Sequence, residues 1–240
     1  MEHAIDAVVV GAFDLGEADR VVRLLTPQEG RVSVVARRAR SSRRRFGGML
    51  EVGTHVQVVR ARSRGRMMNL SEVDRIAGPD VARTELERIA LLSYGCEVCA
   101  ALAPEAAPAE KLFQLLIVWL DLLEGERRPT VASRVALEAK ALTFAGLTPA
   151  LGRCALCPEP VEDPMVFDVE VGGALHARCG GGRATPARAL LELEALRRMP
   201  LADTVAQDER PVTPWRLSDF VQHQLGRRLQ SRSFLETIGG

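Results

Sequence analysis

The first 78 residues consist of short apolar, β-branched runs separated by polar turns. Runs of this length, bounded by turn residues, predict β-strands. In one run Val32, Val34 and Ala36 sit at every second position, which is the spacing of one face of a strand. We expect five strands, at residues 4–13, 20–26, 31–39, 54–62 and 66–76.

Five short strands joined by turns predict a small closed or partly closed barrel. An OB-fold is the obvious five-stranded candidate, although the spacing fits an SH3-like barrel nearly as well. We assign this barrel to residues 1–79.

From residue 80 the apolar residues recur at helical spacing. Candidate N-caps are Asp80, Thr130, Thr185 and Thr213, and the last two precede a proline, which suits the first helical position. Five helices are predicted, at 80–103, 108–125, 130–146, 185–199 and 213–229. They form a helical domain from residues 80–150 and 184–240, so the chain is α+β and multidomain.

Residues 151–183 interrupt the helices and contain "CALC" at 154–157 and "HARC" at 176–179. Two such knuckles, 18 residues apart, predict a tetrahedral metal site. Three thiolates and one imidazole suit Zn²⁺. We expect one structural zinc per chain, bound by Cys154, Cys157, His176 and Cys179.

The alternative is that these side chains are unliganded groups in a loop. A closed four-ligand site has no position for water, so catalysis at the metal is not expected. The segment has few large apolar residues, so metal binding would supply much of its folding energy. A third C-x2-C pair, Cys96 and Cys99, lies in a helical pattern on one face with Leu92, and packing explains it better.

The formal net charge of +1 conceals a strong asymmetry. Residues 31–66 contain eleven Arg and one acid, Glu51, and sum to +10, whereas residues 1–30 sum to −4 and residues 67–240 to −5. Two clusters of arginine flank the predicted fourth strand. They comprise Arg37, Arg38, Arg40, Arg43, Arg44 and Arg45, followed by Arg60, Arg62, Arg64 and Arg66.

Guanidinium groups pair bidentately with phosphate, so the two clusters predict a surface that binds nucleic acid and tolerates both single and double strands. The alternative is a merely solvated face. Only Phe13 and Phe46 are aromatic before residue 80, so we expect phosphate contacts to dominate over base stacking.

No Ser/His/Asp grouping, phosphate-binding glycine loop or acidic cluster suggests catalysis, so an enzyme is not expected. The N-terminus has no basic region of an export signal, and "LFQLLIVWLDLL" is too short to span a membrane. We therefore expect a cytoplasmic protein, associated with the nucleoid and not with a membrane.

The stretch "GEADRVVRLLTPQEGRVSVVARRARSSRRRFGGMLEVGT" resembles the opening of the RecO family of bacterial recombination mediators. The matching parts are Ala18-Asp19-Arg20, the "LLT" strand, the basic loop and "RFGGMLE"; the helices and paired knuckles also match. His176 stands where Cys is frequent in the family, and "LEVG" replaces a more usual Pro and aromatic.

The resemblance implies an OB-fold, a helical domain and a zinc module. It also implies DNA binding, annealing of complementary strands, and assembly with RecR to load recombinase onto DNA coated by single-strand-binding protein. A zinc-containing transcription or RNA-binding regulator with the same basic barrel is the alternative, and it should prefer one sequence or RNA structure.

Overall fold

The computed structural model describes residues 4–41, 46–61, 67–157, 159–207 and 209–238. The chain forms two compact units, Met1–Glu124 and Gly125–Gly240. The first contains a barrel and two long helices, and the second contains the remaining helices and a small sheet. The division into three domains expected from the sequence remains a prediction.

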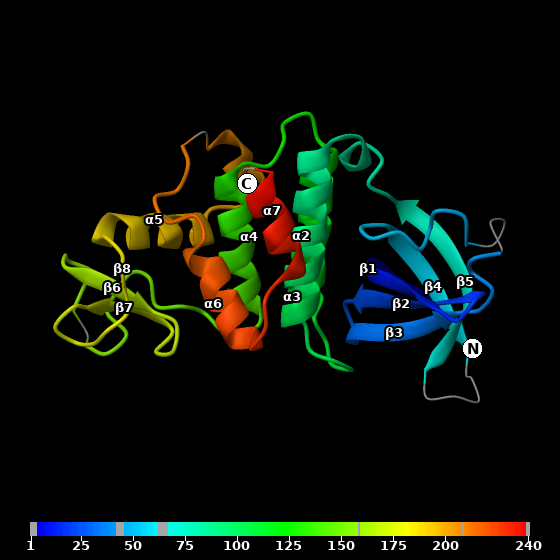
Figure 1. Ribbon diagram of the computed structural model, residues 1–240, viewed down its shortest axis with the longest axis horizontal. Helices are drawn as coiled ribbons and strands as arrows, with labels where there is room; N and C mark the ends of the chain where they lie inside the picture. Colours follow the sequence, from blue (N-terminus) through cyan, green and yellow to red (C-terminus); the bar gives the residue numbers. More distant parts are fainter. Residues whose placement is uncertain (1–3, 42–45, 62–66, 158, 208, 239–240) are drawn as a thin grey trace. The chain divides into compact units, whose positions relative to one another are not determined.

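The first unit begins with a closed five-stranded barrel (Figure 1). Its strands are β1 (Ile5–Leu15), β2 (Asp19–Thr26), β3 (Gly30–Ala36), β4 (His55–Ala61) and β5 (Met68–Ala77). They follow the order β1-β2-β3-β5-β4, with β3 and β5 parallel and β1 closing against β4. The predicted OB-like barrel is confirmed.

The barrel forms because alternate residues of each strand turn inward into one apolar core. Val22, Leu24, Val34 and Val56 are all at most 1% exposed within this core. Phe46, which lies in the segment between β3 and β4, is buried among these core residues. The phenyl ring therefore belongs to the barrel interior.

Two helices pack together beside the barrel, α2 (Leu86–Leu102) and α3 (Glu110–Glu124), after a short 3₁₀ turn η1 (Ala82–Thr84). Gly95 has no side chain, which lets the indole of Trp119 lie against α2 and donate a hydrogen bond to the carbonyl of Leu91 at 3.1 Å. Asp80 was expected to cap this helix, and that is wrong. Its carboxylate pairs with Arg75, and α2 begins six residues later.

The second unit has α4 (Val131–Phe144) in contact with α5 (Ala187–Arg198), the 3₁₀ helix η2 (Leu201–Ala206) and α6 (Arg216–Leu225), followed by α7 (Gln230–Thr237). Thr130 caps α4 as predicted, in a reciprocal pair with Ser133. The two Thr-Pro caps are wrong. Thr185 bonds to the carbonyl of Arg183, and α6 begins three residues after Thr213.

The segment between α4 and α5 contains a sheet that the sequence pattern did not predict. It consists of β6 (Met165–Asp168), β7 (Gly173–His176) and β8 (Arg183–Ala184), in the order β7-β6-β8. Met165, Phe167 and Leu175 are at most 4% exposed, and Phe167 meets Phe220 of α6 edge-on at 6.0 Å. The sheet therefore shares an apolar core with α6. Among the described residues, no helix is long and apolar enough to cross a membrane.

Candidate metal centre and nucleic-acid interface

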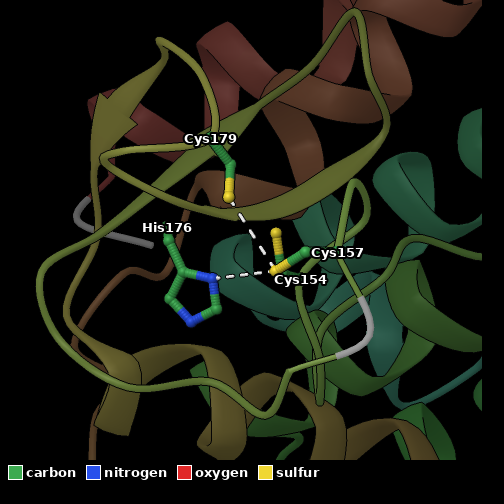
Figure 2. A group of neighbouring side chains, drawn as sticks. All are labelled: Cys154, Cys157, His176 and Cys179. Carbon is green, nitrogen blue, oxygen red and sulfur yellow. Dashed lines mark hydrogen bonds between the residues drawn. The ribbon is translucent and has the colours of Figure 1, made fainter.

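The two Cys/His knuckles meet in the second unit. Cys154 and Cys157 lie in the loop before β6, His176 ends β7, and Cys179 lies in the turn that follows. The amide of Ala155 donates to the carbonyl of Ala174 at 2.8 Å, which ties the first knuckle to the strand that carries the second. Figure 2 shows the four side chains pointing toward one another.

The distances between the ligand atoms fit a tetrahedral metal ion. All four lie within 4.8 Å of one another. Sγ of Cys157 lies 3.4 Å from Nδ1 of His176 and 3.8 Å from Sγ of Cys179. Zinc–sulfur bonds of about 2.3 Å at the tetrahedral angle place two sulfurs about 3.8 Å apart. The cluster can therefore hold one metal ion.

The hydrogen bond on the far side of the His176 ring identifies which nitrogen faces the cluster. Nε2 lies 3.0 Å from the carbonyl oxygen of Pro160, which can only accept, so Nε2 carries the proton. In the neutral ring Nδ1 then keeps its lone pair, and it faces Cys157. Such outer hydrogen bonds orient metal-binding histidines, so Nδ1 is the expected ligand atom.

The surroundings of the cluster shift the pKa values of two of its thiols in opposite directions. Burial alone would raise the pKa of Cys154, but backbone N–H groups of both knuckles donate to its sulfur and lower the pKa to about 6. Burial and the neighbouring sulfurs raise the pKa of Cys179 to about 11. One thiolate therefore disfavours ionisation of the neighbouring thiols. A bound divalent cation would offset the repulsion between the negative sulfurs.

The basic segment after β3 is anchored to the barrel at its start. Oδ1 of Asp19 accepts the backbone N–H of Arg38 at 2.8 Å, and Oδ2 accepts from Nη1 of Arg37 at 2.5 Å. The amide of Arg38 and the guanidinium of Arg37 hold the pKa of Asp19 below its usual range. The segment is anchored again at Phe46, because that side chain lies in the barrel core.

Most of the described arginines in residues 31–66 have carboxylate partners from outside that range. The charge of these described arginines is thus partly balanced by acids that are distant along the chain. The pairs are Arg31 with Glu105, Arg37 with Asp19, Arg40 with Asp14, and Arg60 with Glu29. The predicted DNA-binding residues Arg43, Arg44, Arg45, Arg62, Arg64 and Arg66 lie outside the described residues.

A cavity of about 330 Å³ is lined by Asp14 of β1, Arg20 of β2 and residues of the segment between β3 and β4, among them Arg40 and Phe46. Its charged lining is balanced, because Arg20 lies 3.4 Å from Asp14 and 3.6 Å from Glu51, while Arg40 lies 3.5 Å from Asp14. Charge alone therefore does not favour an anion inside this cavity.

Comparison with known proteins identifies the family of the chain. Residues 1–78 match the family model described as Recombination protein O N terminal, and residues 83–233 match Recombination protein O C terminal. The chain belongs to the RecO family.

Relatives match over nearly the full length of the chain. The chain is 42% identical to the DNA repair protein RecO of Anaeromyxobacter sp. strain K, over 98% of this chain and 96% of that protein. It is 38% identical to the protein of that name from Myxococcus xanthus, and the match covers 98% of this chain and 97% of that protein. It is 31% identical to the DNA repair protein RecO of Pelotomaculum thermopropionicum, and the match covers 99% of this chain and 94% of that protein.

Sequence reasoning missed the anchoring role of Asp19 and the positioning role of Pro160. Asp19 lies 18 residues from Arg37 along the chain, so only the pairing of β2 with β3 brings them together. Pro160 acts through its carbonyl group, which every residue has, so no signal in the sequence could have identified it.

Proposed function

We propose that this chain is a recombination mediator without catalytic activity. It binds single- and double-stranded DNA and anneals complementary strands. With RecR, it helps to load recombinase onto DNA coated by single-strand-binding protein. The family and the names of its members as DNA repair proteins support this proposal. The protein would act in the cytoplasm, at the nucleoid.

The observation that carries the proposal is the anchoring of the arginine-rich segment at two points on a five-stranded barrel. Asp19 fixes its start at Arg37 and Arg38, and Phe46 fixes its end in the core. A loop fixed at both ends presents its side chains with less loss of conformational entropy on binding than a free tail. Arg43, Arg44 and Arg45 lie between the anchors in sequence.

Within the proposed set of DNA-binding residues, the described arginines contribute unequally. Arg37 and Arg40 are about half exposed, so their carboxylate partners leave part of each guanidinium accessible to phosphate. The side chain of Arg60 is only 13% exposed and is held by Glu29, so we expect it to contribute least. Phosphate contacts carry no sequence information, which suits an annealing protein.

We also propose that the three domains expected from the sequence have separate roles. Residues 1–79 would bind DNA, residues 80–150 and 184–240 would form the helical domain, and residues 151–183 would bind structural zinc. The four ligand atoms within 4.8 Å support the last assignment.

An annealing assay on complementary oligonucleotides of arbitrary sequence tests the proposal. The purified chain should accelerate annealing of any complementary pair, and addition of RecR should alter its action on strands coated by single-strand-binding protein. A chain that instead bound one DNA sequence or RNA structure, and annealed nothing, would be a zinc-containing regulator.

A further inference from the structure

Phe13 is the exposed aromatic residue of the described part of the barrel. Only Phe13 and Phe46 are aromatic before residue 80, and Phe46 is 3% exposed in the core. Phe13 is 45% exposed, and Leu15, two positions further along β1, is 41% exposed. The two side chains lie two positions apart on the same strand and therefore on one face, where they form a small apolar surface.

A β-bulge places Phe13 on the outer face of the barrel. Ala7 and Val9 of β1 point into the core, so strict alternation would also send Gly11 and Phe13 inward. The pairing of β1 with β2 shifts between Val9 and Gly11. Beyond that shift Ala12 lies opposite the inward Val22, which turns Gly11, Phe13 and Leu15 outward.

Arg23 of β2 packs against the exposed Phe13 ring. It lies opposite Gly11 in the strand pairing, and its guanidinium lies over the Phe13 ring, 5.1 Å from the ring centre. The side chain of Arg23 is exposed. Within the described residues it forms no ion pair with a carboxylate, unlike Arg20, which lies near Asp14 and Glu51.

We propose that Phe13 and Arg23 form a stacking platform for one nucleobase of single-stranded DNA. This inference rests on the DNA binding proposed above and adds a contact to the base. An exposed aromatic face stacks on any base, and a guanidinium without a carboxylate partner adds cation–π attraction and can reach the adjoining phosphate. Strands β2 and β3 and the loop after β1 are where OB-folds bind oligonucleotides, and Phe13 borders that loop.

The platform changes the expected chemistry of the barrel surface. Phosphate contacts are made to the backbone, which single strands and duplexes share, so they discriminate little between the two forms. A stacking site instead requires an accessible base face, which single strands offer and duplexes cover. Stacking on the Phe13 ring therefore adds affinity for single strands without adding to the salt dependence.

The test compares oligothymidylate with an abasic oligomer of the same length for the wild type and Phe13→Leu. The substitution keeps an apolar side chain but removes the aromatic face. It should weaken binding of oligothymidylate by about fivefold to a hundredfold, with an unchanged salt slope, and leave binding of the abasic oligomer unchanged. Phe144→Leu, at another exposed phenylalanine, is the matched control and should change neither.

A fluorescent variant gives a second readout. Phe13→Trp should keep wild-type affinity, and the fluorescence it adds to that of Trp119 and Trp215 should be quenched by oligothymidylate but not by the abasic oligomer. Equal affinity of wild type and Phe13→Leu for oligothymidylate would overturn the platform while DNA binding stands. Equally weakened binding of both oligomers would show that Phe13 only supports the surface. If the wild type binds neither oligomer, the proposed function itself fails.

Discussion

The guanidinium of Arg60 and the carboxylate of Glu29 form two parallel hydrogen bonds, of which Nη1 to Oε2 is 3.0 Å long. This pair joins β4 to the turn between β2 and β3. Bidentate pairs between arginine and a carboxylate fix the relative orientation of the two side chains. They are also stronger than pairs joined by a single hydrogen bond. Arg60 therefore contributes to the architecture of the barrel, whatever it adds to DNA binding.

The first prediction is that Arg60→Ala destabilises the barrel more than it weakens DNA binding. Removal of a largely buried arginine leaves Glu29 without its partner, so the free energy of unfolding should fall by about 1 to 2 kcal/mol. Arg75→Ala breaks the more exposed pair with Asp80 and should cost less than about 1 kcal/mol. Urea unfolding measures both. A fully stable Arg60→Ala with a reduced salt slope for DNA would mean that Arg60 binds phosphate.

The second prediction concerns the knuckles. Protein purified without chelator should contain about one zinc per chain, and Cys154→Ala/Cys179→Ala should contain none. Phe167 and Leu175 give the surrounding sheet an apolar core, so the double variant should lose the order of the knuckles while α4 remains helical. Metal analysis and circular dichroism measure the two effects.

The matched control at this site is His176→Cys. It supplies a thiolate at the position of the imidazole, so zinc content should stay near one per chain, whereas His176→Ala should reduce it. Zinc retained at full occupancy by Cys154→Ala/Cys179→Ala would show that the metal is bound elsewhere.

The third prediction uses Cys96 and Cys99, both at most 1% exposed in α2. Burial raises the pKa of Cys96 from 9.0 to about 12, and it raises the pKa of Cys99 as well. Above pH 9 the unfolded chain releases these two protons while the folded chain retains them. Stability therefore falls as pH rises, by up to about 1.4 kcal/mol per pH unit for each cysteine.

The measurement for this prediction is urea unfolding at several pH values between about 8 and about 11. Cys96→Ala/Cys99→Ala should show a shallower loss of stability than the wild type, because the metal-site thiols ionise in both proteins and cancel in the comparison. Identical slopes would mean that these thiols ionise in the folded protein. A thiol reagent should also leave both unmodified until the chain unfolds.

The barrel and the knuckles were predictable because their signals are local. Alternation in residues such as Val32, Val34 and Ala36 fixes which face is buried, and the spacing of Cys154 and Cys157 is a short-range pattern. The helix cap at Thr130 was likewise readable within four residues. The burial of Cys96 and Cys99 followed from helical spacing.

The features that were missed depend on tertiary pairing. The outward turn of Phe13 requires the bulge between Val9 and Gly11, and the hydrophobic run through these residues does not indicate where register shifts. The neutralisation of Arg37 and Arg60 requires acids that are 18 and 31 residues away. The Thr-Pro motif at 185 failed as a cap because the amide of Ala187 binds Asp163 instead.

The last prediction concerns the arginines between the two anchors. Replacing Arg43, Arg44 and Arg45 together with Ala should weaken binding to all DNA sequences alike, because phosphate contacts carry no sequence information. Removing one phosphate contact lowers the slope of log affinity against log salt by about 0.7 to 0.9, so the triple variant should flatten it by roughly two units. The fold should survive, since Asp19 and Phe46 hold the segment on either side.

A salt titration of single-strand binding measures this slope, with circular dichroism to check folding. The matched control replaces Arg127, Arg128 and Arg188, which are exposed in the second unit, and so removes the same charge elsewhere. None of these three arginines belongs to the proposed DNA-binding set, so the control should leave the slope nearly unchanged. A folded triple variant with the wild-type slope would mean that Arg43, Arg44 and Arg45 form a solvated face. DNA would then have to bind through another surface.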